Sequence, residues 1–243
     1  EMCIRDRYIV PKIADRMKLS SPVKLIEYEG DEVYVTDVNN QTYAGDKVIV
    51  TVPLNILKSD LISFNPALPA IKAEALNRTN MPAGLKVFIK FSQKFYPDIV
   101  LMDGLIAGSD AEKTYYNAAF KKDTSDHVFA LFSVGPKAQE LIDLGSDQAI
   151  FERVMNELDE MFDGQASEFY VDHVIQNWST EPYIQGAYSF GGDAYNETIA
   201  TLSEPIDNKV YFAGEALEAD YWATVHGAGL SGRAEAERIL TGG

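Results

Sequence analysis

The most constraining feature of the sequence lies near its C-terminal end, where an apolar strand leads into a helix that begins with small residues. Residues 210–213 are apolar and Gly214-Glu215 follows them, and the helix start contains the small residues Gly227, Ala228, Gly229, Ser231 and Gly232. Without bulky side chains, this helix start lets another backbone or a flat ligand approach closely. Its unpaired N–H groups and partial positive charge favour a ligand oxygen or nitrogen that carries negative charge.

Glu215 stands at the carboxyl end of the strand, where acidic residues of nucleotide-binding proteins accept hydrogen bonds from sugar hydroxyls. A solvated carboxylate and a helix packed through small side chains would explain the same residues, and for a glycine-rich helix start alone that is the commoner interpretation. The whole run 210–232, however, resembles the C-terminal flavin-binding motif of the flavin-containing amine oxidases (monoamine and polyamine oxidases). The resemblance extends over most of the chain and implies FAD as the cofactor.

The resemblance also implies which residues meet the flavin. Glu215 would bind ribityl or ribose hydroxyls, and the helix that starts near Val225 would stabilise the anionic reduced flavin. The full predicted cofactor-binding set is Val23, Trp178, Gly214, Glu215, Val225, Gly227 and Ala228.

Composition limits the partners. The chain has 243 residues, enough for one large domain or two small ones, and a net charge of −16 from 21 Lys and Arg against 37 Asp and Glu. Such an acidic chain is a poor ligand for nucleic acid or for an anionic membrane. Attraction of a cationic substrate and a well-solvated surface both remain compatible with the charge.

Residues 1–7 hold the only cysteine, Cys3, and resemble a translated sequencing adapter, so they are excluded from fold reasoning. Residues 8–20 resemble the frayed end of something larger. The rest of the chain has no thiol for disulfides or metal, its three histidines lack ligand spacing, and no apolar run has the length of a membrane span. We expect no metal site and a soluble, cytoplasmic protein.

The pattern over residues 23–52 predicts a β-meander, with strands at 23–26, 33–36 and 48–52, the last stopped by Pro53. The resemblance implies that strand 48–52 returns to the flavin-binding sheet and that Val23 lies against the adenine. An ordinary core valine is the alternative for Val23.

Further along, the pattern predicts a helix over 70–79 and strands over 84–91, 115–120 and 127–134. Ser146 is placed to cap a helix over 147–162. The apolar stripe of this helix predicts a core face and consists of Ile150, Val154, Leu158, Met161 and Phe162.

Three residues in this region gain a role only through the resemblance. Lys86, in Gly84-Leu85-Lys86, would hold a water beside flavin N5, and the loop at Trp178 would lie close to the flavin. Tyr188 would form one wall of an aromatic cage that attracts and orients the substrate amine and excludes water. Alone, a lysine at a strand start is usually solvated, and a Trp and a Tyr in one loop usually pack together.

Two departures from the family pattern carry information. Ala187 stands where some members attach the flavin through cysteine, which implies a non-covalently bound FAD. Thr224 stands where monoamine oxidases have the second cage aromatic, so the cage is half built and looks more like that of the polyamine-oxidase branch. A different substrate is the alternative.

Family members begin with a strand, a Gly-x-Gly-x-x-Gly turn and a helix that bind the FAD pyrophosphate, and no such motif is identified in this sequence. The expected fold is mixed α/β: a partial FAD-binding Rossmann-like domain (8–57 and 178–243) and a mixed-sheet substrate domain (58–177). The chain is therefore interpreted as a C-terminal fragment that binds FAD weakly or not at all and is inactive alone.

The predicted function of the parent is FAD-dependent oxidation of a primary or secondary amine, with a polyamine as one candidate. The resemblance implies hydride transfer to flavin N5, with Lys86, Tyr188 and Thr224 as the catalytic set and oxygen re-oxidising the flavin to give hydrogen peroxide. A desaturase or protoporphyrinogen-type oxidase of the same fold is a second hypothesis. A flavin-fold interaction module without catalysis is a third. The oligomeric state and the identity of the amine are left open.

Overall fold

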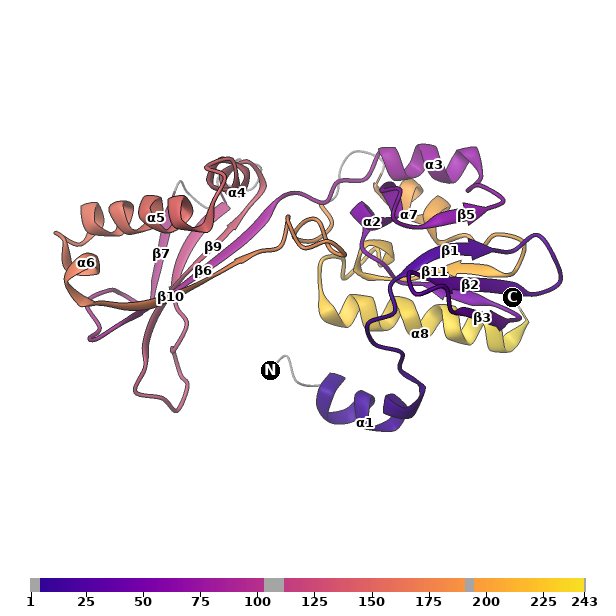
Figure 1. Ribbon diagram of the computed structural model, residues 1–243, viewed down its shortest axis with the longest axis horizontal. Coiled ribbons are helices and arrows are strands. Elements are labelled where there is room, and N and C mark those ends of the chain that lie inside the picture. Colours follow the sequence, from indigo (N-terminus) through magenta and orange to yellow (C-terminus); the bar gives the residue numbers. More distant parts are fainter. Residues whose placement is uncertain (1–4, 103–111, 191–194, 243) are drawn as a thin grey trace.

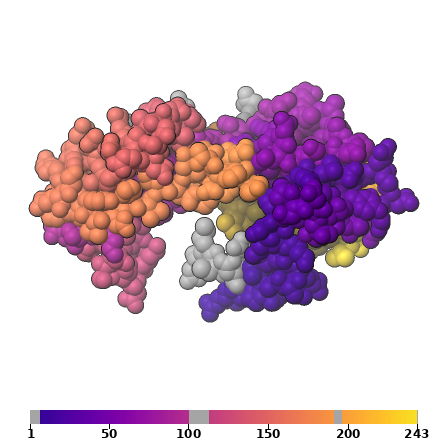
Figure 2. Space-filling view, viewed as in Figure 1, coloured from indigo at the N-terminus to yellow at the C-terminus, as the bar shows by residue number. Residues whose placement is uncertain are grey.

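The computed structural model describes residues 5–102, 112–190 and 195–242, which form two lobes joined by a narrow neck (Figure 1). We define the first lobe as residues 23–78 and 195–242, the second lobe as residues 84–177, and the neck as residues 79–83 and 178–190. The space-filling view shows the same division, with the orange part of the chain crossing between the two lobes (Figure 2). The predicted mixed α/β class is confirmed.

The first lobe contains a four-stranded sheet in the order β3-β2-β1-β5, in which β5 is parallel to β1, and a separate parallel pair, β4 and β11. Its strands are β1 (Val23–Glu27), β2 (Val33–Asp37), β3 (Thr42–Gly45), β4 (Val48–Val50), β5 (Ser63–Asn65) and β11 (Val210–Phe212). Its helices are α2 (Leu54–Lys58), α3 (Ala70–Asn77), α7 (Tyr195–Ser203) and α8 (Val225–Thr241). Its core includes Ile26, Val33, Val50, Val210 and Phe212.

The second lobe is a five-stranded antiparallel sheet in the order β10-β6-β9-β8-β7, with α4, α5 and α6 beside it (Figure 1). Its strands are β6 (Gly84–Phe91), β7 (Ile99–Met102), β8 (Glu112–Asn117), β9 (His127–Val134) and β10 (Tyr170–Asn177). Its helices are α4 (Gly135–Ile142), α5 (Asp147–Met161) and α6 (Gln165–Phe169).

Alternation along β6 decides which face of this sheet is covered. Leu85, Val87 and Ile89 are buried in one core with Val154 and Leu158 of α5, so these side chains face the helices. The intervening Lys86 and its neighbours at every second position point to the other face.

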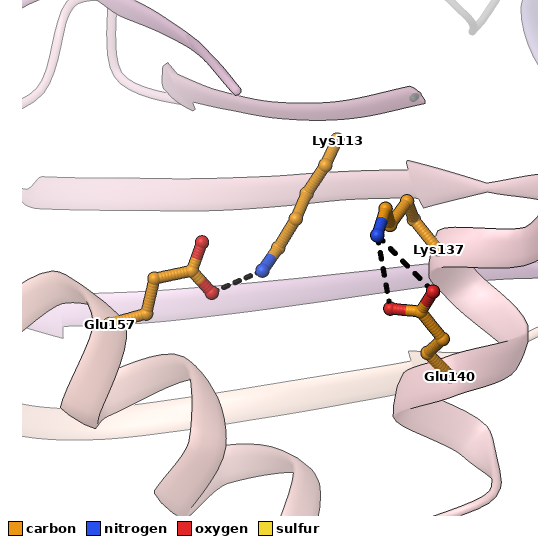
Figure 3. Close-up of polar contacts among 4 residues, drawn as sticks. All are labelled: Lys113, Lys137, Glu140 and Glu157. Carbon is orange, nitrogen blue, oxygen red and sulfur yellow. Dashed lines mark hydrogen bonds and ion pairs between the residues drawn. The ribbon is translucent and has the colours of Figure 1, made fainter. Parts of the chain in front are cut away.

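Ionic contacts add to the packing on the helical side (Figure 3). Lys113 of β8 reaches Glu157 of α5 in an ion pair whose side chains are 11% and 15% exposed. Lys137 and Glu140 pair within α4 at 3.2 Å and are more exposed. Only the first of these pairs joins a strand to a helix.

The strands predicted at 23–26, 33–36, 84–91 and 127–134 are confirmed, as is the helix over 147–162, where Ser146 Oγ accepts the N–H of Ala149 at 3.2 Å. The helix predicted over 70–79 is α3. Strand 48–52 is shorter than predicted and ends at Val50, and the predicted strand 115–120 begins earlier and ends at Asn117. Residues 5–16, predicted as leader and frayed end, form short helical turns: Arg5–Ile9, α1 (Val10–Ile13) and Ala14–Arg16.

The two lobes are a geometric division of the chain, and the predicted boundary at residue 58, which divides it by binding role, stays a prediction. Residues 63–65 form β5 and pair with β1, and α3 packs against α7, so both belong to the first lobe. The second lobe begins at Gly84, because the sheet order from β6 onward is self-contained. Among the described residues, no helix is long and apolar enough to cross a membrane.

Candidate functional site

The site is built around the end of β11. Val210, Tyr211 and Phe212 are almost fully buried, and β11 runs parallel to β4 with Phe212 opposite Val50. This pairing confirms that the strand beginning at residue 48 lies in one sheet with the strand before Glu215. Gly214 follows with a φ of 152° and donates its N–H to Ser231 Oγ of α8 at 3.2 Å, which ties the strand end to the helix.

A cavity of about 350 Å³ lies where the neck meets the first lobe. Three separate parts of the chain contribute to its walls: the residues after β4, the neck, and the residues from Ala213 into α8. Val52, Ala187, Tyr188, Gly214, Glu215 and Ala228 are among the lining residues. Of the predicted site residues, the structure therefore brings Tyr188, Gly214, Glu215 and Ala228 together around one space.

Glu215 is the one charged side chain among the residues that line this cavity. Its Oε1 accepts the N–H of Ser189 at 3.0 Å, and its Oε2 accepts Ser189 Oγ–H at 2.7 Å and the N–H of Ala223 at 2.8 Å. A carboxylate has about four lone-pair positions. Three are occupied by the protein itself, which leaves about one position for a ligand hydroxyl.

The start of α8 is fixed by Thr224, which caps the helix. Its Oγ1 accepts the N–H of Gly227 at 3.0 Å and donates to the carbonyl of Tyr221 at 2.5 Å. A Cβ at Gly227 would lie 2.0 Å from that same carbonyl oxygen. The preceding loop is thus close enough to require glycine at position 227, which is the backbone approach that the sequence analysis gave beside a flat ligand.

The pattern Gly-x-Gly-x-x-Gly does occur in the sequence, at residues 227–232. The prediction that the pattern is absent is therefore wrong. The structure places this run inside α8, after the Thr224 cap. It is not the turn that directly joins a strand to a helix, which is the geometry that a pyrophosphate cradle needs.

Two further predicted residues, Lys86 and Trp178, lie in or next to the neck. Its two segments are hydrogen-bonded to each other, through Phe190 N–H to Asn80 O at 2.8 Å and Ala187 N–H to Pro82 O at 2.8 Å. A Cβ at Gly84 would lie 2.7 Å from Ala187 Cβ, so glycine is needed where the segments cross.

Lys86 follows two residues after that crossing and does not line the cavity. Its Nζ lies 5.6 Å from the centre of the Phe132 ring, on the open face of the sheet. Trp178 donates its backbone N–H to Gly84 O at 3.1 Å, and the residue is about one-third exposed.

Val23 and Val225 also lie outside the cavity. Val23 lines a second cavity of about 420 Å³, which shares Val52 with the first. Val225 is 75% exposed at the first position of α8. The roles predicted for Val23, Trp178, Lys86, Thr224, Val225 and Gly227 stay predictions.

Two residues that sequence reasoning did not single out are Ser189 and Ala223. Ser189 is fully buried, and Ala223 has a left-handed backbone with a φ of 57°. Both contact Glu215, which is 26 and 8 residues away along the chain. The sequence signal that could have pointed to Ser189 is its position directly after Tyr188.

The donors and acceptors around the cavity fit a flavin. The first turn of α8 precedes the cavity-lining Ala228, and the N–H groups of Val225 and His226 in that turn donate to no backbone carbonyl among the described residues. Most of the lining is apolar, and Glu215 supplies a single carboxylate. A flat apolar ring with a negatively charged edge and a hydroxylated tail matches these groups. In the described part of the chain, no group of three or more His, Cys, Asp or Glu could hold a metal ion.

Comparisons with known proteins agree with this chemistry. The family model described as flavin containing amine oxidoreductase matches residues 7–240. Lysine-specific histone demethylase 1B of Mus musculus is 34% identical over 243 residues, which cover 95% of this chain and 29% of the mouse protein. Polyamine oxidase 1 of Zea mays is 32% identical over 235 residues, which cover 94% of this chain and 46% of the maize protein.

Among solved structures, putrescine oxidase bound to putrescine superimposes with a TM-score of 0.79 at 18% identity, over 96% of this chain and 51% of that one. This likeness confirms the predicted fold. The chain spans less than half the length of the two curated relatives named here.

Proposed function

The chain belongs to the flavin-containing amine oxidoreductases, and we propose that it contributes the substrate lobe and the closing flavin-binding motif to an enzyme that oxidises a primary or secondary amine. The predicted family and its flavin are confirmed by the family match. The reaction and the substrate are our proposals, because the chain covers only part of its relatives.

The observation that carries the proposal is the cavity at the end of β11, where Tyr188 of the neck and Glu215 and Ala228 of the first lobe lie around one space. We assign FAD to this cavity without a covalent bond, since Ala187 offers no thiol. Glu215 would accept one flavin hydroxyl, and the N–H groups at the start of α8 would face the negatively charged edge of the ring. When bound, FAD supplies the acceptor for the hydride that leaves the carbon next to the amine nitrogen.

The protein side chains would orient the substrate and exclude water. Tyr188 lines the cavity with an aromatic face that attracts an amine. Thr224 would stand on the second side of this amine cage (Tyr188 and Thr224), which it leaves half built, because it has no aromatic ring and its hydroxyl caps α8. Lys86 would donate from Nζ to a water, on the open face of the second lobe where we place the rest of the substrate.

The test is anaerobic mixing of the full-length, FAD-loaded protein with a panel of amines: a monoamine, a diamine and a polyamine. Bleaching of the oxidised flavin absorbance by at least one amine is the expected result. Indifference to every amine, with flavin bound, would instead support the desaturase or protoporphyrinogen-type alternative. A protein that binds no flavin would support the interaction module.

A first prediction concerns Lys86. Lys86→Met should slow flavin reduction or re-oxidation by roughly 10²-fold or more, the size of effect expected when a positioned proton-transfer group is lost. Lys90→Met is the matched control, because Lys90 lies on the same strand and face but is exposed and paired with Asp126 at 2.7 Å. Near-normal rates of both half-reactions in Lys86→Met would remove this residue from the site.

A second candidate substrate is an N-methylated lysine side chain in a protein. The chain is about as similar to histone demethylases as to polyamine oxidases, at 34% and 32% identity. Its net charge of −16 is compatible with a cationic peptide. Bleaching by a methyl-lysine peptide and not by free polyamines would select this substrate.

A further inference from the structure

The Glu215 carboxylate accepts hydrogen bonds from two separate chain segments. Ser189, at the end of the neck, donates hydrogen bonds to both carboxylate oxygens, from its N–H at 3.0 Å and from its hydroxyl at 2.7 Å. Ala223, in the loop before α8, donates its N–H to Oε2 at 2.8 Å. One side chain thus fixes the distance between two segments that are far apart in sequence.

Each of these donors is the immediate neighbour of a cage residue. Ser189 follows Tyr188, and Ala223 precedes Thr224. We propose that Glu215 is a positioning residue that sets the spacing between the two walls of the amine cage, and that Ser189 is the residue through which it positions Tyr188. This inference rests on the proposed function, since it concerns how the protein recognises its amine.

The Tyr188 side of this arrangement leaves little freedom. Ser189 is fully buried, and two parallel hydrogen bonds to a carboxylate fix orientation as well as distance. Phe190 then donates its N–H to Asn80 O, so the segment is held again one residue later. Tyr188 therefore enters the cavity from a backbone that is anchored directly behind it.

The Thr224 side is held in a strained conformation. Ala223 has a φ of 57°, in the left-handed region that is uncommon for residues other than glycine. Such strain persists where the surroundings fix the backbone, and here the Ala223 N–H is held by Glu215 while Thr224 Oγ1 caps Gly227 and holds Tyr221 O. Without the carboxylate acceptor, the strained residue loses the hydrogen bond from its own N–H.

The consequence is a coupling between cofactor and substrate. With about three of its four acceptor positions filled by the protein, Glu215 has room for about one flavin hydroxyl. A ligand that donates a hydrogen bond to this carboxylate also affects the hydrogen bonds by which the carboxylate holds the segments of Tyr188 and Thr224. The arrangement predicts that disturbing Ser189 weakens amine binding and leaves FAD binding unchanged, whereas disturbing Glu215 weakens both.

The experiment compares Ser189→Ala and Glu215→Gln in the full-length protein. Ser189→Ala removes one hydrogen bond to Oε2 and should raise the amine concentration for half-maximal anaerobic flavin reduction about fivefold to tenfold, with little change in the limiting rate. Ser189→Thr, which restores the hydroxyl, should recover most of the affinity. Ser179→Ala is the control, because Ser179 Oγ accepts the Gly84 N–H at 3.0 Å in the same neck and does not contact Glu215. The amine used is the one that bleaches the wild-type flavin fastest.

A second readout needs no flavin. In Glu215→Gln apo-protein, the amide nitrogen faces the N–H of Ser189 or of Ala223 in place of an acceptor, so one of the two segments loses its tie to residue 215. The loop before α8 should then open more often, and chymotrypsin should cleave faster after Tyr221. Tyr221 is 50% exposed and Tyr183, at 53%, is an internal reference outside that loop. The apo-protein readout does not depend on any amine reaction.

Equal amine affinities for Ser189→Ala and Ser179→Ala, or unchanged cleavage after Tyr221 relative to Tyr183, would overturn the inference. A wild type that no amine bleaches would overturn the proposed function instead, and the cleavage ratio would then decide alone whether Glu215 holds the loop.

Discussion

The two lobes are assembled in opposite ways. The second lobe uses one continuous stretch, residues 84–177, and its strands β6 to β10 all belong to one antiparallel sheet. The first lobe joins residues 23–78 to residues 195–242, and its central parallel pair, β4 and β11, brings together Val50 and Phe212. The candidate cavity is on the side of the molecule that depends on such distant pairing. The cavity residues are thus brought together by pairing between distant parts of the chain, whereas the sheet of the second lobe forms from one continuous stretch.

Each lobe also contains a lysine with little solvent exposure, and the two ammonium groups have different kinds of partner. Lys113 of the second lobe meets a carboxylate, Glu157. Lys72 of the first lobe is 4% exposed and donates to the carbonyls of Thr201 and Leu202, at 3.0 and 2.6 Å, with its Nζ 4.4 Å from the centre of the Phe212 ring. Lys113 has a carboxylate in direct contact, whereas Lys72 donates to carbonyls and lies over an aromatic ring, with the carboxylates of Glu204 and Glu235 acting without a direct ion pair. The contrast predicts different responses to mutation and to pH.

The largest expected effect comes from breaking the ion pair of the second lobe. Lys113→Met leaves Glu157 largely buried without its partner and should lower the free energy of unfolding by about 3–5 kcal/mol. Far-UV circular dichroism during urea unfolding follows the secondary structure of both lobes, so early unfolding of the second lobe lowers its overall midpoint. The fluorescence of the two tryptophans, Trp178 and Trp222, reports regions outside the second lobe.

If the lobes are independent, the circular dichroism midpoint should fall and the fluorescence midpoint should stay. The double variant Lys113→Met/Glu157→Leu should recover most of the loss, because no unpaired charge remains. Coincident shifts of both midpoints would show that the lobes unfold as one unit.

A smaller effect is expected from Gly227→Ala in the first lobe. The added Cβ would lie 2.0 Å from the Tyr221 carbonyl, a backbone atom that cannot rotate away, so the loop must shift at a cost of about 3 kcal/mol. Gly229→Ala, in the same helix with nothing within 4 Å of the new Cβ, should stabilise by about 1 kcal/mol through helix propensity. Thermal unfolding followed by fluorescence measures both. Equal stabilities for the two variants would mean that the loop before α8 is not fixed.

A pH dependence of similar size is expected to belong to the first lobe. Burial lowers the pKa of Lys72 from 10.5 to about 8, and the nearby carboxylates of Glu204 and Glu235 offset part of this. Because the folded pKa is below the unfolded one, folding disfavours the charged lysine, and stability should rise between about pH 8 and about pH 10.5 by on the order of 3 kcal/mol.

Lys72→Met removes the titrating group and should flatten this window. The difference between wild type and variant in urea midpoint, measured at both ends of the window, isolates Lys72 from the other groups that titrate. A constant difference across the window would contradict the assigned pKa.

Much of the fold could be predicted because the signals are local. Runs rich in apolar residues predicted β6 and β9, and the stripe from Ile150 to Leu158 predicted α5 with its Ser146 cap. The sequence was weaker where tertiary contacts decide. β10 reads as half polar because it is an edge strand with Val174 exposed, and α4 begins at Gly135-Pro136, which resembles a turn. The assignment of β5 to the first lobe depends on its pairing with β1, which no local pattern encodes.

The candidate site shows the same limit. Gly214, Glu215 and Ala228 could be placed from one motif, and Tyr188 from a second, since each motif is continuous. The contacts of Glu215 with Ser189 and Ala223 could not, because a hydrogen bond across 26 residues leaves no periodicity. The requirement for Gly227 was predicted correctly as a close approach, but the approaching group is the Tyr221 carbonyl.

The neck has a consequence for how such proteins can diversify. Trp178 N–H and Gly84 O are 3.1 Å apart, so the second lobe leaves and rejoins the rest of the molecule at nearly the same point. A unit whose entry and exit are adjacent behaves as an insertion, and insertions of this geometry can be lengthened or exchanged without moving the ends they connect. The sheet of the second lobe can in this sense be exchanged as a unit, whereas the close contact between Gly84 and Ala187, where the neck segments cross, must be kept.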